Sequence, residues 1–177
     1  FGSVTFGTPS NAESTVAAPG MGDVDDQAEN YGASVHDARW DYTMDGITLA
    51  VSGVSDGDAS AAGLKYTSGS LAIAVASSTI SNGNTWNGVS IGTTIGSLAV
   101  SAMGANKNGT SSSGIGATFD ATNLGLGSVS LAFANREGNT NTWGIGMSKD
   151  LGGLTLAANW TNVAGTETAT AGISMGF

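Results

Sequence analysis

The sequence has no cysteine, few charged residues and no long apolar run, and each absence excludes a class of protein. Without cysteine, the chain has neither a disulfide framework nor a thiolate metal site. Charged residues make up 11% of its 177 residues, against about a quarter in ordinary soluble domains. No apolar run approaches the roughly 18 residues of a membrane-spanning helix. A net charge of -9 argues against nucleic acid as a partner.

The chain is instead rich in glycine, with 28 residues, and in short alternating segments. Large apolar residues occupy every second position, with alanine, serine, threonine or glycine between them. This period of two is typical of β-strands. Clear examples are 47–52, 71–76 and 128–133; the others are 1–7, 34–45, 60–66, 85–95, 98–105, 112–121, 142–149, 154–161 and 167–177. The pattern predicts twelve strands.

The connections between these segments predict an antiparallel meander. Tight glycine-bearing turns at 45–46, 67–69, 95–97, 122–127 and 150–153 alternate with more polar and generally longer connections at 55–59, 78–84, 106–111, 136–141 and 161–167. We therefore expect an up-and-down sheet with short turns on one rim and longer loops on the other.

The small face of each strand favours a transmembrane β-barrel over a soluble sandwich. Two packed sheets need large side chains that interdigitate, and a soluble sandwich would carry more surface charge. In a membrane barrel, apolar residues face lipid while glycine, serine and threonine face a water-filled interior. Aromatic residues close to strand ends are predicted to form girdles at the two membrane interfaces: Trp40, Tyr42, Tyr66, Trp86, Trp143, Trp160 and Phe177.

Three segments resemble general bacterial porins of Gram-negative bacteria, which are sixteen-stranded trimers. The last strand, ending in Phe177, looks like the terminal signature that the outer-membrane assembly machinery recognises. The start "FGSVTFGTPSNAEST" resembles the strand that leads into the inward-folded third loop. Residues 36–53, "HDARWDYTMDGITLAVSG", are similar to the strand that leaves that loop and its return strand. The alphaproteobacterial, Rhodobacter-like porins are the most similar in their acidic loop and Gly/Ala-rich strands.

The resemblance implies one porin domain over residues 1–177, corresponding to strands 5–16 of the sixteen. Segment 8–33 would be the constriction loop that folds into the barrel. Strands one to four would then precede Phe1, and a complete twelve-stranded barrel is the alternative.

The resemblance also implies a function. The chain would be a homotrimer in the outer membrane, surrounded by lipid and lipopolysaccharide, and would form a water-filled channel for small hydrophilic solutes and ions. No enzymatic activity and no required cofactor are implied. Two other classes stay open, namely an autotransporter-type export barrel and a soluble Gly/Thr-rich adhesin.

The segment 8–33 is the longest without a pattern and carries acidic residues but no lysine or arginine. Its carboxylates would make a constriction attract cations; they belong to Glu13, Asp23, Asp25, Asp26 and Glu29. A solvated external loop is the other interpretation. Asp23, Asp25 and Asp26 also offer the oxygen ligands that calcium prefers, although their spacing is not that of an EF-hand.

Strand parity places a few charged residues on the water-facing side. Arg39 and Asp41 lie opposite Trp40 and Tyr42, and by the same parity Lys65 and Asp120 line the pore. A charge at the lipid-facing midplane would cost about 2–4 kcal/mol, which favours this assignment. A Ser-His nucleophile would have to be built around the only histidine, His36, at the edge of the loop, and the sequence shows no nucleophile motif. We therefore expect His36 to be a rim or loop residue.

Overall fold

The computed structural model describes residues 2–17, 28–29, 36–80, 83–139, 141–163 and 165–175. These residues form one antiparallel sheet of twelve strands, each paired with its neighbours in sequence. The strands are β1 (Ser3–Phe6), β2 (Ala38–Met44), β3 (Ile47–Gly53), β4 (Ser60–Ser68), β5 (Leu71–Ile80), β6 (Asn84–Ile95), β7 (Leu98–Lys107), β8 (Thr110–Asp120), β9 (Ser128–Arg136), β10 (Thr142–Asp150), β11 (Leu154–Val163) and β12 (Thr166–Met175). The predicted up-and-down meander of twelve strands is confirmed.

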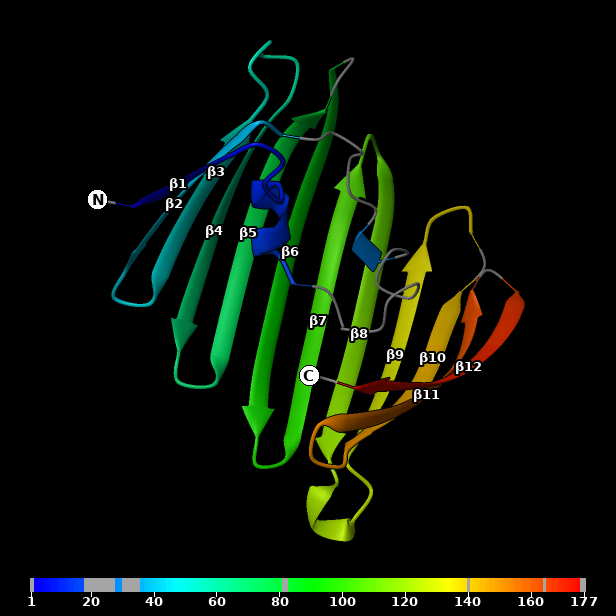
Figure 1. The fold of residues 1–177 in the computed structure, drawn as a ribbon. Helices are drawn as coiled ribbons and strands as arrows, with labels where there is room; N and C mark the ends of the chain where they lie inside the picture. The colour runs from blue at the N-terminus through cyan, green and yellow to red at the C-terminus, as the bar shows by residue number, and fades with distance from the viewer. Residues whose placement is uncertain are drawn as a thin grey trace.

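The sheet curves around a hollow, and the short 3-10 helix η1 (Ala12–Thr15) lies on its concave side (Figure 1). We call this side the inner face and the convex side the outer face. Within the described residues, β1 and β12 are the two edges of the sheet and do not pair with each other, so the predicted barrel is not closed in the structure. No helix in the described part of the chain is long and apolar enough to cross a membrane.

The turns differ from the prediction, as two examples show. The expected longer loop at 106–111 is a two-residue turn, because β7 continues to Lys107 and β8 starts at Thr110. Asn108 and Gly109 both adopt positive φ, 51° and 86°, which is the geometry of a tight Asn-Gly hairpin. Conversely, the expected tight turn at 122–127 is longer and contains a second 3-10 helix, η3 (Thr122–Leu124). Loop length therefore does not separate the two rims.

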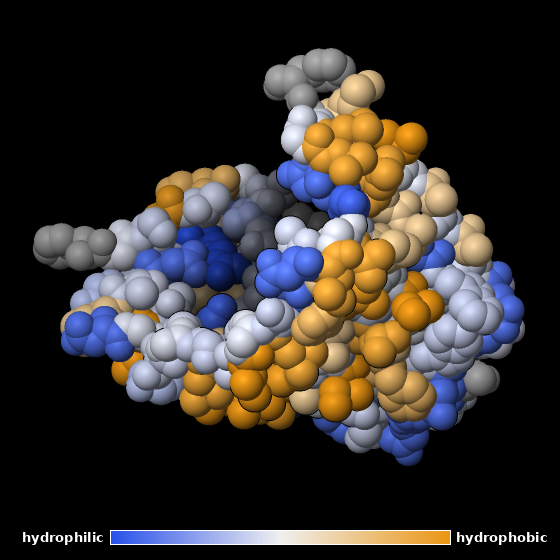
Figure 2. Space-filling view, turned by 90° about the horizontal axis from the view of Figure 1, so that it is seen from below, coloured by the Kyte–Doolittle hydropathy of each residue, from blue (hydrophilic) through white to orange (hydrophobic). Residues whose placement is uncertain are grey.

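The two faces of the sheet have the predicted opposite character. Apolar side chains of neighbouring strands line up on the outer face: Leu49 pairs with Leu64, Leu64 with Val75, and Val75 with Val89. All four are exposed, by 37–49%. Seen along the strands, hydrophilic residues surround the hollow and hydrophobic residues cover much of the outside (Figure 2). This inside-out pattern is that of a barrel whose outer face meets lipid.

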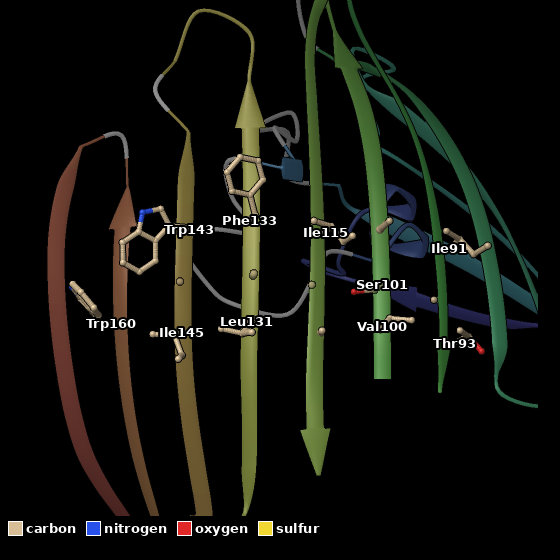
Figure 3. Close-up of a pocket in the computed structure, with 16 residues that line it drawn as sticks. Ile91, Thr93, Val100, Ser101, Ile115, Leu131, Phe133, Trp143, Ile145 and Trp160 are labelled. Carbon is tan, nitrogen blue, oxygen red and sulfur yellow. The ribbon is translucent and has the colours of Figure 1, made fainter. Parts of the chain in front are cut away.

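Aromatic rings on the outer face form pairs. Trp40 and Tyr42 stack with ring centroids 6.0 Å apart, and Trp143 and Trp160 meet edge to face at 5.0 Å. The second pair borders a shallow apolar groove of about 730 Å³ that crosses β6 to β11 (Figure 3). Its larger side chains are Ile91, Ile115, Leu131, Phe133, Ile145 and Trp160.

Trp86 is an exception, and its predicted place in an aromatic girdle is wrong. On β6 it pairs with Lys107 of β7 and Ser78 of β5 on the inner face, where it is fully buried. The ring lies over Gly88: a Cβ atom added to Gly88 would come within 2.2 Å of the indole carbons. The parity of β6, rather than closeness to a strand end, decides which way this side chain points.

Candidate functional site

The inner face carries a small apolar core that joins the loop to the wall. Val16 and Ala28, which lie on either side of segment 18–27 of the loop, are buried together with residues of the strands. The strand residues of this cluster are Ala74, Ala76, Trp86, Met103, Ala105, Ala132 and Ala134. A second cluster joins Ala12 of η1 to Ala50 and Ala61. The small side chains of the inner face therefore make room for the described ends of the loop, besides facing water.

Helix η1 sits directly on β4. A Cβ atom added at Gly63 would lie 2.4 Å from Thr15 Oγ1 and 2.6 Å from the Ala12 carbonyl oxygen. No side chain fits between backbone and helix at such a distance, so glycine at this position sets how close η1 comes to the wall. The Thr15 hydroxyl in turn donates to the Ala12 carbonyl at 2.6 Å and closes the helical turn.

Ser52 ties both ends of the loop to the wall. Its hydroxyl oxygen accepts the backbone N–H of Ala12 at 2.8 Å, at the start of η1. The same oxygen lies 2.6 Å from Nδ1 of His36, just before β2. His36 and Ser52 are thus in contact, but both residues are almost fully buried, with exposed fractions of 1% and 4%. Because no substrate can reach a hydroxyl so enclosed, the pair is an anchor of the loop.

Three further side chains hold loop backbone on the inner face. The Ser90 hydroxyl accepts the N–H of Ala17 at 3.0 Å. The Ser112 hydroxyl donates to the carbonyl of Ala28 at 2.7 Å, and the indole N–H of Trp86 donates to the carbonyl of Glu29 at 2.7 Å. The loop backbone is therefore fixed at residues 17 and 28–29, on both sides of segment 18–27, above β6 and β8.

Arg39 and Asp41 lie on the inner face of β2 and pair with each other. Arg39 Nη2 lies 2.8 Å from Asp41 Oδ1, and Nε lies 2.9 Å from Oδ2, so the guanidinium meets the carboxylate as a fork. The remaining nitrogen, Nη1, reaches the loop and lies 2.9–3.2 Å from four oxygen atoms of Ser10, Asn11 and Ser14.

The other two predicted pore-lining residues also lie on the inner face. Lys65 on β4 is half-buried and pairs with Thr48 and Ala74. Asp120, the last residue of β8, is exposed, and its carboxylate accepts the backbone N–H of Thr122 at 2.9 Å and the Thr122 hydroxyl. It therefore starts the η3 turn at the rim.

The structure describes two of the five acidic residues of the loop, Glu13 and Glu29. Glu13 lies in η1 and is only 3% exposed, so its side chain belongs to the contact surface of η1. Glu29 is half-buried, and its backbone carbonyl accepts the Trp86 indole N–H. Asp23, Asp25 and Asp26, together with Phe177, lie outside the described residues, and the calcium site stays a prediction. Among the residues that the structure describes, no group of three or more histidine or acidic side chains is arranged to hold a metal ion.

Solved structures share the fold of this chain. Two mutants of the Rhodobacter blastica porin superpose on 98% of the chain, with TM-scores of 0.75 and 0.76. The chain has a porin fold. Sequence identity to both mutants is 14%, and the match spans 73% of their length. The porin fold is also shared with a loop-deletion mutant of OmpT, an outer membrane protein of Vibrio cholerae, at a TM-score of 0.66 and 12% identity over 98% of this chain and 74% of that one. No protein-family model and no curated protein matches the chain.

Within this porin fold, the His36 anchor is expected to weaken in acid. Burial lowers the pKa of His36 below its ordinary 6.5, and the nearby Asp37 offsets part of this effect. The native state then binds a proton less readily than the unfolded chain, so the free energy of unfolding falls as the pH drops below about 6.5, by up to about 1.4 kcal/mol for each pH unit. Urea unfolding at about pH 7.5 and about pH 5.5 measures this loss.

A variant separates His36 from the other titrating groups. His36→Asn should lose less stability over the same pH interval, because it retains a polar partner for Ser52 but cannot gain a proton. Asp37 does not interfere, since hydrogen bonds from the Ser55 N–H and hydroxyl hold the pKa of its carboxyl below the usual 3.8. Equal acid sensitivity in the variant and the wild type would assign the effect to another group.

Proposed function

We propose that the protein is an outer-membrane porin that forms a water-filled channel for passive diffusion of small hydrophilic solutes and ions. The observation that carries the proposal is the loop of the chain's own residues anchored on the hydrophilic inner face of a sheet with a porin fold, while the outer face is apolar. A segment that covers part of a pore wall narrows the pore, and narrow pores select solutes by size and charge.

We further propose that the channel works as a homotrimer in the lipopolysaccharide-bearing outer membrane of a Gram-negative bacterium, without catalytic activity. In this proposal Asp23, Asp25, Asp26 and Glu29 give the constriction a preference for cations, because a narrow pore with low-dielectric walls focuses their field. The inner-face charges at Asp41, Lys65 and Asp120 modulate that preference.

The two alternatives fit the described geometry less well. An export barrel needs its interior for a threaded segment, whereas here the inner wall from β3 to β8 holds the chain's own loop. A soluble adhesin would leave its aligned leucines and valines in water. Many of the exposed large apolar residues line the same outer face, which suits lipid.

Single-channel recording in planar bilayers tests the proposal. The purified full-length protein should insert in steps of uniform conductance, and a salt gradient should give a reversal potential of the sign expected for a cation-preferring pore. Protein that is folded by circular dichroism but gives no steps would contradict the channel function. Steps with an anion preference would contradict only the role of the acidic loop.

A further inference from the structure

Among the inner-face cations, Arg39 differs from Lys65 in what its charge does. Three of the contacts of Arg39 are made with the Asp41 carboxylate, and the remaining ones reach the loop entry at Ser10, Asn11 and Ser14. Its side chain is only 15% exposed. Lys65, in contrast, makes no hydrogen bond or ion pair within the part of the chain that the structure describes.

From this geometry we propose that Arg39 is the positioning residue that fixes the entry of the loop on the pore wall, and so sets the open cross-section of the channel. This inference rests on the proposed channel function. The positive charge of Arg39 is neutralised by Asp41, so the residue acts through the place at which it holds the loop rather than as a binding site for permeating anions.

Asp41 makes this role possible by orienting the guanidinium. The carboxylate takes Nε and Nη2 in a fork, which leaves Nη1 pointing away from the strand and toward the loop. There Nη1 meets the carbonyls of Ser10 and Asn11, each at 3.0 Å, and the Ser14 hydroxyl at 2.9 Å. That hydroxyl also donates to the Asn11 carbonyl at 2.7 Å. The arginine thus holds three polar groups of one turn.

This contact complements the Ser52 anchor. Ser52 holds the backbone N–H of Ala12, whereas Arg39 holds the carbonyls that precede it. Arg39 on β2 is the donor and Ser52 on the neighbouring β3 is the acceptor, and together they fix the orientation of the same turn. Lysine cannot replace the arginine, because its single ammonium lacks the planar fork that binds carboxylate and loop at once.

The test compares variants that separate charge from position. Arg39→Lys retains the charge and loses the fork, whereas Arg39→Met loses both. The matched control is Lys65→Met, which removes one positive charge from the same wall without touching the loop entry. We expect open-channel current noise to rise about twofold or more in both Arg39 variants, since loss of a charge-assisted fork frees the loop entry. In Lys65→Met we expect a reversal potential shifted toward cations at wild-type noise.

Proteolysis gives a readout that does not depend on conductance. Glu13 is buried in η1 beside the loop entry, so a glutamate-specific protease should cut there slowly in the wild type. Cleavage after Glu13 should be faster in Arg39→Lys and Arg39→Met and unchanged in Lys65→Met. Ser14→Ala removes one of the acceptors and should show a smaller change in the same direction. This variant still tests the contact if the arginine variants fail to fold.

The outcomes distinguish the two proposals. A wild-type protein that gives no current steps contradicts the channel function, while the protease rates still decide whether Arg39 fixes the loop. Wild-type channels with Arg39→Lys noise and cleavage rates equal to wild type would overturn the role of Arg39 alone. If the noise rises equally in Arg39→Met and Lys65→Met, the cause is the lost charge and not the lost position of the loop.

Discussion

Replacement of Gly63 by valine is expected to lift η1 from the inner face, with loss of stability and a changed conductance. Even the Cβ atom of alanine would lie 2.4 Å from Thr15 Oγ1 and 2.6 Å from the Ala12 carbonyl oxygen, so the helix has to move. Overpacking of this kind costs about 1–3 kcal/mol. A helix displaced toward the hollow should also lower single-channel conductance. Urea unfolding followed by tryptophan fluorescence and planar-bilayer recording measure the two effects.

Gly92 offers a matched control on the neighbouring part of the same face. An added Cβ there meets its nearest atom, the Val100 carbonyl oxygen, at 3.6 Å, which is ordinary contact. Gly63→Ala should therefore be less stable than Gly92→Ala, although both changes restrict the same kind of strand backbone. If the two alanine variants unfold at the same urea concentration, the close seat of η1 on β4 is not a feature of the protein in solution.

Replacement of Trp86 by alanine is expected to be the most destabilising change in the loop–wall contact. The side chain is fully buried between the loop and Gly88, and large-to-small replacement of a buried tryptophan costs about 3–5 kcal/mol. Trp86→Phe retains most of the apolar volume and removes the N–H that binds the Glu29 carbonyl, which should cost about 1–3 kcal/mol. Urea unfolding followed by circular dichroism measures both losses.

Trp160 is the control for Trp86. It lies on the outer face and is 46% exposed, so its replacement by alanine removes less buried area. The two tryptophans should therefore differ clearly in their effect on the unfolding midpoint. A larger loss at Trp160 than at Trp86 would mean that packing of the outer face, and not the anchored loop, dominates stability.

The strands and their faces could be predicted because a period of two is a local signal. Each strand repeats it independently, and the pairing of sequence neighbours then follows from the hairpins. The same parity puts Arg39, Asp41, Lys65 and Asp120 on one face of their strands, and their role in lining a pore stays a prediction. Turn length was harder to predict, since Asn108 and Gly109 form a two-residue hairpin within a polar stretch that resembles a loop.

The anchors of the loop could not be predicted because they depend on contacts across many residues. Ser52, Ser90 and Ser112 look like ordinary water-facing serines, and only the path of the loop gives them partners. Trp86 differs from these serines: its closeness to a strand end suggests a membrane girdle, whereas its parity, which is a local signal, points inward. A large aromatic residue with inward parity in a wall of alanine and glycine was the signal available in the sequence.

The alanine-rich strip beneath the loop has a consequence for engineering the proposed channel. Removing the loop to widen the passage would uncover Ala74, Ala76, Ala105, Ala132 and Ala134, which are now buried. Such a bare apolar band does not hold water as well as the serines and threonines around it, and apolar constrictions in channels can close by dewetting. A loopless channel would then conduct less than its enlarged diameter suggests, unless the uncovered alanines were also replaced by serine.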